Sequence, residues 1–446
     1  MVATLTPPGP RVFFPLHLAT KFRSAPLPFI KQMTSAYGNN VYINMRGIGK
    51  YYLFNDPEII QQVLVTRQRS FHKGRGFNVL KHLTGNGLVT SEDELHLRQR
   101  RMIQPMFHKQ HIASYAEMMV AITTRRTENW QNGGILDLHT EMSYLTMLIV
   151  NKTLFAMDIE SEARELGEVI TTLTTSYTYG LGLIGSLRMR LPFPYTKRIL
   201  TARARLESAI QAMIAKRRAE GNQNDLLSML IAACDDEDET RRMDDKQIRD
   251  EALTLFLAGN ETTANALTWT FYLLSQNPTI SKRLQAELDS VLGGRNPSFS
   301  DIESLSYTRM VFSEALRLYP PAWIMLRKAI EDVQIGEYLV PKGSSVILCQ
   351  WITHHNENYY PDPFKFDPER WQPEAIAARP KMAYFPFGGG TRACIGEHFA
   401  WMEGILLLAT IAQKWEMHLT PGSSVELLPE LTLRPKHGIK MMFTLR

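Results

Sequence analysis

Residues 385–396 read Phe-Pro-Phe-Gly-Gly-Gly-Thr-Arg-Ala-Cys-Ile-Gly, and the interpretation of the whole chain starts from them. An apolar helical pattern follows, with Phe399 and Met402 on one face. Cys394 is therefore expected in a glycine-rich loop at the N-terminus of a helix. The helix dipole and the backbone N–H groups favour a thiolate at that place. Glycines would also let the backbone approach a flat cofactor closely.

Two simpler interpretations compete with this one. A single cysteine is most often a small buried hydrophobic residue. A glycine-rich loop before a helix can also hold phosphate, but the loops that do so use a lysine, and none lies between 382 and 413. The full spacing Phe387-x-x-Gly390-x-Arg392-x-Cys394-x-Gly396 fixes five identities and is hard to obtain by chance.

This spacing resembles the haem-binding signature of the cytochrome P450 family. The resemblance implies that Cys394 ligates the iron of haem b, Arg392 pairs with a propionate and Phe387 shields the sulfur. Gly396 would let the ring approach closely. The implied fold is mainly α with a small β portion, and the haem lies between a long central helix and the helix that follows the cysteine ligand.

Glu314-Ala-Leu-Arg317 matches the family's ExxR motif in spacing. Taken alone, such a pair is usually a solvated contact on a helix surface. Asp367-Pro-Glu-Arg370-Trp371 resembles another family segment. The resemblance implies a buried network of Glu314, Arg317 and Arg370 with a structural role, which must be almost fully paired to be tolerated.

Ala258-Gly-Asn-Glu-Thr-Thr263 interrupts a long helical pattern with residues of low helix propensity. The Thr262 hydroxyl can bond the carbonyl of Ala258 and distort the helix there. The segment resembles the family's oxygen-groove motif. The resemblance implies that Ala258 lies above the haem, that Thr262 hydrogen-bonds the oxygen bound to the iron, and that Glu261 relays protons.

Three further residues are candidates for holding the haem propionates. His96 and Arg100 lie in a segment that resembles the family's W-x-x-x-R motif, with His96 where many members have tryptophan. Arg327 stands where the family commonly has another arginine that binds a propionate. Without the cysteine motif, each arginine would be interpreted as an ordinary surface residue.

The composition excludes several classes of protein. The net charge is +5 over 446 residues, and no basic run is interleaved with aromatic residues, so nucleic acid is not expected as a partner. Three scattered cysteines argue against a disulfide framework and a zinc site, and a reducing cytoplasm fits them best. The N-terminus lacks a signal-peptide pattern and no apolar stretch of about 20 residues occurs, so neither a leader nor a membrane anchor is expected.

The pattern along the chain predicts one monomeric domain over 1–446, because no linker-like segment divides it. The β-rich portion is expected at about 40–65 and 327–350, and the remainder is expected to be helical. A β-hairpin is predicted over 41–54, a helix from Asp56-Pro57 through Val65, and a loop with short helical pieces over 71–93. A helix from about Asp244 to Gln276 would be about 50 Å long.

These resemblances imply a monooxygenase that inserts one oxygen atom of O₂ into a lipophilic small molecule such as a terpenoid or a fatty acid. Electrons would come from a separate ferredoxin or flavodoxin with its reductase. No charged group is clearly placed to anchor a carboxylate, which favours a terpenoid. Residues 171–195 would form a lid, and the implied pocket wall comprises Phe77, Val79, Leu88, Val89, Ala322, Trp323 and Ile324.

Two alternatives remain open at this point. A peroxygenase or a haem-thiolate isomerase would need no electron donor, but neither reaction needs the Glu261-Thr262 pair. A haem sensor or carrier would bind the cofactor and form no product.

Overall fold

The computed structural model describes residues 5–12, 15–74, 76–155, 191, 193–221, 225–235 and 238–446. The chain divides into two compact units. Unit 1 contains Met1–Asn78, Leu316–Lys365 and Arg370–Cys394; unit 2 contains Val79–Ala315, Phe366–Glu369 and Ile395–Arg446. Each unit is assembled from distant parts of the chain, so neither corresponds to one continuous stretch of sequence.

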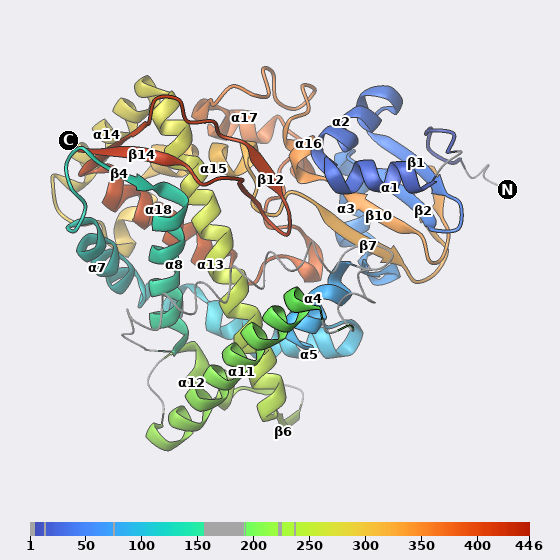
Figure 1. Ribbon diagram of the computed structural model, residues 1–446, viewed down its shortest axis with the longest axis horizontal. Coiled ribbons are helices and arrows are strands. Elements are labelled where there is room, and N and C mark those ends of the chain that lie inside the picture. The colour runs from blue at the N-terminus through green and yellow to red at the C-terminus, as the bar shows by residue number, and fades with distance from the viewer. Residues whose placement is uncertain are drawn as a thin grey trace. The chain divides into compact units, whose positions relative to one another are not determined.

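Unit 1 is built on a five-stranded sheet in the order β1-β2-β10-β7-β3. The predicted hairpin is confirmed as β1 and β2, which are antiparallel, while β10 pairs with β2 in parallel. Figure 1 shows the blue strands of the N-terminal region beside the orange strands of residues more than 270 positions later. The strands of this sheet are β1 (Asn40–Met45), β2 (Gly49–Phe54), β3 (Phe71–Lys73), β7 (Met325–Ala329) and β10 (Ser345–Leu348).

Aromatic and branched side chains on one face of this sheet form the core of unit 1. Tyr52, Phe54, Val346 and Leu348 are buried there, and the Phe54 ring stacks on Tyr338 with centroids 5.9 Å apart. Tyr338 belongs to a small hairpin of β8 (Val333–Ile335) and β9 (Tyr338–Val340). Alternating residues of a strand point to one face, so the hydrophobic pattern fixes the register of the pairing.

Short helices surround this sheet. The helix predicted from Asp56-Pro57 through Val65 is confirmed in extent, but it is an α-helix only over Pro57–Gln61 (α3) and continues as a π-helical turn over Gln62–Thr66. The Asp56 carboxylate caps its start by accepting from Glu58 N at 2.9 Å. The other α-helices of unit 1 are α1 (Pro15–Ser24), α2 (Pro26–Tyr37), α16 (Gln350–His354) and α17 (Pro373–Ala377).

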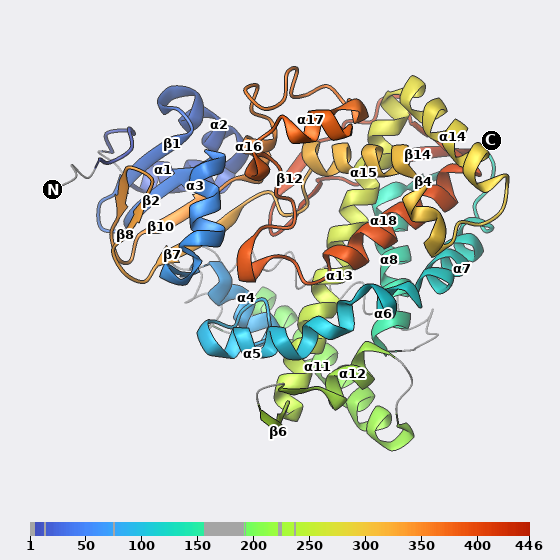
Figure 2. The ribbon, with the colours of Figure 1, turned by 180° about the vertical axis from the view of Figure 1, so that it is seen from behind.

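Unit 2 is mostly helical, and its central element is α13 (Asp245–Gln276), as the sequence predicted. Its 32 residues span about 48 Å. Asp244 caps the N-terminus by accepting from Gln247 N at 2.7 Å. Figure 2 shows α13 crossing this unit beside α8 (Leu138–Phe155) and α18 (Glu397–Ala412). Buried apolar side chains along most of α13, among them Phe256, Leu267 and Trp269, hold it in the core.

Further helices of unit 2 pack around these three. Among the described residues they are α5 (Asp93–Ile103), α6 (Lys109–Ala113), α7 (Ala116–Thr127), α11 (Pro194–Glu220), α12 (Leu226–Ala232) and α14 (Pro278–Leu292). Two more helices begin in one unit and end in the other, α4 (Gly76–Thr84) and α15 (Ser306–Leu318). Within the described part of the chain, no helix combines the length and apolar character that a membrane crossing requires.

The expectation that the chain is helical outside 40–65 and 327–350 is wrong. Unit 2 contains a three-stranded antiparallel sheet in which β14 lies between β11 and β4, a hairpin of β12 and β13, and the short pair β5 and β6. Each strand is short, and β4 pairs with residues about 300 positions later, so no local pattern marks it. These strands are β4 (Gly134–Asp137), β5 (Cys234–Asp235), β6 (Asp238–Arg242), β11 (Trp415–Leu419), β12 (Leu427–Pro429), β13 (Leu433–Pro435) and β14 (Lys440–Leu445).

The loop with short helical pieces predicted over 71–93 is corrected in one place. Its first residues form β3 on the edge of the unit 1 sheet, whereas the expected short helix is present as α4 over residues 76–84. The segment between α4 and α5 is irregular. β3 was missed because three residues are too few to show an alternating pattern.

Candidate active site

We call residues 385–394 of unit 1 the cysteine loop. Hydrogen bonds within its own backbone and to one glutamine hold it in place. Cys394 N donates to the carbonyl of Phe387 at 2.9 Å, and Ala393 N donates to the carbonyl of Gly390 at 3.1 Å. Gln68 Oε1 accepts from both the backbone N (2.7 Å) and the hydroxyl (2.9 Å) of Thr391. These bonds close the loop into a compact turn that ends at the cysteine.

Two glycines of this loop are favoured by the backbone conformation, and one of them also by space. Gly388 and Gly390 have φ angles of 75° and 67°, in the left-handed region that favours glycine. A Cβ on Gly390 would clash with the backbone oxygen of Leu64, whereas one on Gly388 would meet Met325 Cε, the end of a flexible side chain. The left-handed conformation therefore explains both glycines, and close packing on a neighbouring backbone segment adds to it at Gly390.

The three cysteines differ in what their sulfur atoms can reach. Cys349 is fully buried, and burial raises the pKa of its thiol to about 12. Cys234 is half-buried and directs its Sγ at the carbonyl of Ala232, 3.5 Å away. Cys394 is exposed at the end of the cysteine loop. A thiolate that binds a metal must be accessible and deprotonated, so Cys394 fits the ligand of a haem iron and Cys349 does not.

The other candidate residues near Cys394 are Arg392, Phe387 and Gly396. Arg392 ends a 3₁₀ turn over Gly390–Arg392 and is half-buried, as is Phe387. Gly396 is the N-cap of α18, and its carbonyl accepts from Ala400 N at 2.8 Å. Their contacts with a haem remain predictions.

The middle of α13 in unit 2 carries the predicted hydroxyl-to-carbonyl bond. Thr262 Oγ1 donates to the carbonyl of Ala258 at 2.8 Å, and the helix continues as an unbroken α-helix through both residues. Residues 251–256 and 263–271 are buried, whereas Ala258 is exposed and Thr262 is half-buried. An exposed alanine in the middle of a buried helix leaves open space on that side, which fits the room that a bound planar group needs.

Glu261 takes part in a hydrogen-bonded chain that sequence reasoning missed. Its Oε1 accepts from the hydroxyl of Thr432 at 2.6 Å, and Thr432 Oγ1 accepts from Asn265 Nδ2 at 3.1 Å. Asn265 Oδ1 lies 3.0 Å from Nε2 of His139, so this ring nitrogen is the donor. Burial lowers the pKa of His139, which favours the neutral ring. The chain orients the Glu261 carboxylate, and nothing near Glu261 in the sequence signals it, because Thr432 is 171 residues away.

A second acid lies behind the same part of α13. Glu403 on α18 is fully buried, and burial raises the pKa of its carboxyl to about 8, with the neighbouring Thr263 side chain opposing the rise. The sequence gives no reason to single out this glutamate, because its position in an apolar helix is apparent only from the packing.

The three propionate candidates lie on regular elements. His96 and Arg100 are four residues apart on α5 and therefore share a face; His96 is buried and Arg100 is half-buried. Arg327 lies in β7 of unit 1, is almost buried, and donates from Nη1 to the carbonyl of Leu326 at 3.0 Å. Neither arginine is the plain surface residue that the simpler interpretation assumed.

The predicted pocket residues are spread over several segments. Phe77 and Val79 lie in α4, whereas Leu88 and Val89 lie in the turn that follows it. Ala322, Trp323 and Ile324 precede β7, and Trp323 is buried with its carbonyl accepting from Trp351 N at 3.2 Å.

Most of the predicted lid over 171–195 lies outside the described residues. The structure describes only 191 and 193–195 of that segment, where Leu191 and Phe193 are exposed.

The ExxR residues are both fully buried on α15. In unit 1, Arg317 Nη1 donates to the carbonyls of His354 (2.7 Å) and Pro363 (2.8 Å). In unit 2, Glu314 Oε1 accepts from Asp367 N at 3.1 Å. The pair therefore anchors irregular backbone inside each unit, which supports the structural role that the resemblance implied.

Comparison with known proteins agrees with the resemblance noted in the sequence. The family model described as Cytochrome P450 matches residues 6–443. Cyclooctatin synthase of Streptomyces melanosporofaciens is 39% identical over 412 residues, which cover 92% of this chain and 89% of the relative. Cyclooctat-9-en-7-ol 5-monooxygenase of the same organism is 37% identical, over 90% of this chain and 87% of the relative. Pentalenene oxygenase of Streptomyces avermitilis is 34% identical, over 94% and 93%.

The chain belongs to the cytochrome P450 family. Membership implies a haem cofactor and the enzyme class of the monooxygenases. In unit 1, the exposed thiol of Cys394 on its closed turn fits the ligand of such a cofactor.

Proposed function

We propose that this protein is a haem-thiolate monooxygenase that inserts one oxygen atom of O₂ into a lipophilic terpenoid. Haem b would be the cofactor, held by Cys394 as the iron ligand and by Arg392, Arg327, Arg100 and His96 at the propionates. When bound, the haem supplies the activation of dioxygen, and the thiolate favours cleavage of the O–O bond.

The observation that carries the proposal is the ordered pair of Glu261 and Thr262. The Thr262 hydroxyl stands on the open side of α13, and the Glu261 carboxylate is oriented by Thr432. An acid beside a hydroxyl can deliver the protons that reduction of dioxygen consumes. A peroxygenase or an isomerase does not need that delivery, and a sensor needs no catalytic acid at all.

Two observations support a terpenoid as the substrate. Two of the relatives are named for the oxygenation of cyclooctat-9-en-7-ol and of pentalenene. The proposed pocket wall is mainly apolar, with Phe77, Val79, Leu88 and Val89 contributed by α4 and the turn after it. A mainly apolar wall suits a neutral lipid.

A separate redox partner completes the proposal. We infer a ferredoxin or flavodoxin with its reductase as the electron donor, a monomeric state, and action in the cytoplasm.

Reconstitution tests the function. The purified protein, reduced and treated with CO, is expected to show the strongly red-shifted Soret band of a thiolate ligand. Cyclooctat-9-en-7-ol and pentalenene are expected to shift the ferric spin state, and palmitic acid is not. With a surrogate ferredoxin, its reductase, NADPH and ¹⁸O₂, the terpenoid product should carry one ¹⁸O atom.

Three outcomes would contradict the proposal. A histidine-like CO spectrum in native protein would remove the haem-thiolate assignment. Product formed with hydrogen peroxide alone, and none with the ferredoxin system, would indicate a peroxygenase. Spectral shifts without any product from either terpenoid would favour a sensor or carrier.

Thr262→Ala tests the assigned proton delivery. We expect the variant to consume NADPH at a similar rate while most electrons leak to hydrogen peroxide, so that the yield of product per NADPH falls about a hundredfold, the lower end of the usual range for a general acid–base group. Thr263→Ala, the neighbouring hydroxyl on the buried side of α13, is the control. Unchanged coupling in Thr262→Ala would contradict the role.

A further inference from the structure

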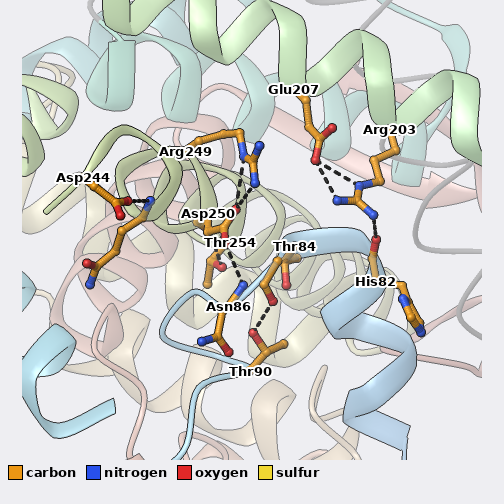
Figure 3. A network of polar contacts seen from close by, with 12 residues as sticks. His82, Thr84, Asn86, Thr90, Arg203, Glu207, Asp244, Arg249, Asp250 and Thr254 are labelled. Carbon is orange, nitrogen blue, oxygen red and sulfur yellow. Dashed lines mark hydrogen bonds and ion pairs between the residues drawn. The ribbon is translucent and has the colours of Figure 1, made fainter. Parts of the chain in front are cut away.

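The segment between α4 and α5 is attached to α13 by two neighbouring carboxylates. We call residues 85–91 the clamp loop. Asn86 N donates to Asp250 Oδ2, and Leu88 N donates to Glu251 Oε2, each at 2.8 Å. Figure 3 shows Asn86 directed at Asp250 from the loop side. Two consecutive helix residues therefore bind alternate backbone N–H groups of a loop about 160 residues earlier in the chain.

Two glycines of the clamp loop stand close to α13. Gly85 has a φ of 68°, in the left-handed region that favours glycine, and a Cβ there would meet the carboxylate of Asp250. A Cβ on Gly87 would lie 2.6 Å from the backbone carbonyl oxygen of Asp250, so this position has no room for a larger residue. At Gly87 the loop therefore packs directly on the helix backbone.

Bonds inside the clamp loop and from α5 make it a fixed turn. Thr90 Oγ1 donates to the carbonyl of Gly85 at 2.7 Å, and Ser91 N donates to the carbonyl of Gly87 at 2.9 Å. Gln99 on α5 donates from Nε2 to the carbonyl of Asn86 at 2.8 Å. Figure 3 also shows Arg203 of α11 reaching the carbonyl of His82, near the end of α4.

The two carboxylates have different surroundings. Asp250 has a cation beside it, because Arg249 Nη2 donates to its Oδ1 at 2.8 Å. Glu251 is fully buried, and its second oxygen, Oε1, has no hydrogen-bond partner among the described residues. Burial raises the pKa of the Glu251 carboxyl to about 8, with the Leu88 N–H opposing the rise and Asp250 adding to it.

Burying a carboxyl group with one oxygen unpaired costs desolvation free energy. An apolar side chain of similar size would fill the same space without the cost of desolvating a carboxyl group. What the carboxyl does provide is a directional acceptor that fixes one particular N–H, that of Leu88. Violations of the packing rules of this kind occur mainly at functional sites.

We propose that Asp250 and Glu251 are positioning residues that fix the clamp loop and thereby set where Leu88 and Val89 stand in the substrate pocket. Leu88 is buried and Val89 is half-buried, so the bond at Leu88 N decides which of these adjacent side chains turns inward. This inference rests on the proposed function for the assignment of both residues to the pocket. The attachment itself can be tested without any substrate.

Hydrogen exchange of the haem-loaded protein tests the attachment. Glu251→Met removes the acceptor while keeping the volume, and the backbone amide of Leu88 is expected to exchange at least tenfold faster than in the wild type. Glu251→Gln keeps one carbonyl acceptor and should raise the rate only about threefold. Glu403→Met is the matched control, because it removes another fully buried carboxyl whose pKa is raised to about 8, on a different helix.

Azole binding tests the consequence for the pocket. Imidazole is the small probe and clotrimazole the large one, each titrated by its Soret shift. Release of the clamp loop in Glu251→Met should lower the Kd of clotrimazole relative to that of imidazole about fivefold, while Glu403→Met leaves this ratio unchanged.

Unchanged exchange at Leu88 in Glu251→Met would overturn the attachment, and faster exchange with an unchanged Kd ratio would overturn the positioning role. Should Glu251→Met not fold, Glu251→Gln decides by the same two readouts at smaller amplitude. Failure of the proposed function is distinguishable, because it would appear in the CO spectrum and the product assay while the exchange result stands.

Discussion

The cysteine loop and the clamp loop both depend on glycines that touch another segment, but they differ in what those glycines meet. Gly390 in the cysteine loop faces a backbone oxygen, that of Leu64. Gly85 in the clamp loop faces the end of a side chain, the carboxylate of Asp250. The cysteine loop is held by backbone bonds, main-chain packing and Gln68, whereas two backbone N–H groups of the clamp loop bind ionisable side chains. We therefore expect the two loops to respond to pH in opposite directions, and the clamp loop to respond more to substitution of a single carboxylate.

The largest effect is expected from substitution of Cys394, the proposed iron ligand. Cys394→Ser should abolish the red-shifted Soret band of the CO complex, because an alcohol is a poor replacement for a thiolate ligand. Cys234→Ser and Cys349→Ser should retain the band. Loss of the band in either control variant, or its persistence in Cys394→Ser, would show that the wrong sulfur has been assigned.

Glycine-to-alanine substitutions compare the two loops directly. Gly390→Ala adds both left-handed strain and a clash with backbone, so we expect the free energy of unfolding to fall by about 2–4 kcal/mol. Gly85→Ala adds the same strain, but the Asp250 carboxylate can rotate away, so a loss of about 1–2 kcal/mol is expected. Chemical denaturation of the two variants measures both values. Equal losses of unfolding free energy in the two variants would mean that the Asp250 side chain is as rigid as the backbone at Leu64.

The pH is expected to act on the carboxyl that holds the clamp loop. The pKa of Glu251 rises from 4.5 to about 8 on folding, so the folded state holds a proton that the unfolded state has released. The stability contributed in this way is complete below about pH 4.5 and is lost as the pH rises towards 8. Each such group changes the free energy of unfolding by at most about 1.4 kcal/mol per pH unit in that window.

Glu251→Gln should therefore make the decline in stability between pH 5 and 8 less steep. Glu403, which has a similarly raised pKa, contributes to the same decline, so Glu251→Gln with Glu403→Gln should flatten it further. Unfolding curves over this pH range provide the measurement. A slope that neither substitution alters would show that these carboxyl groups ionise in the folded protein as they do in the unfolded chain.

The cysteine loop follows the opposite pH direction. The backbone N of Phe385, at its start, donates to Nε2 of His354 at 3.1 Å, which requires an unprotonated nitrogen. Burial lowers the pKa of His354 well below 6.5, so its contribution to stability is present at neutral pH and is lost as the pH falls below 6.5. Acid therefore acts on the histidine that holds the cysteine loop, whereas alkali ionises the buried carboxyl that accepts a hydrogen bond from the clamp loop.

Local pattern predicted the elements whose signals lie within a few residues of one another. The hairpin of β1 and β2, the full length of α13 and the helix after the cysteine were all expected from periodicity and capping residues. The bond from Thr262 to Ala258 was expected for the same reason, because donor and acceptor are one helical turn apart. Elements that depend on distant partners were missed, among them β3, β4 and the strands between 415 and 445.

The sequence by itself determined the family. Cys394, Arg392 and the glycines between Phe387 and Gly396 form one short pattern, and its resemblance to the family's haem-binding signature predicted the haem-thiolate chemistry. The family comparison agrees with that identification over residues 6–443.

Only the tertiary structure decided how the acids are arranged. Glu251 meets Leu88 across 163 residues, and Glu261 meets Thr432 across 171. A hydrogen bond depends on distance and angle, which for residues so far apart are set by the packing of whole helices and strands. The same residue type is therefore a surface charge in one place and a buried positioning group in another, and the sequence around it does not distinguish the two.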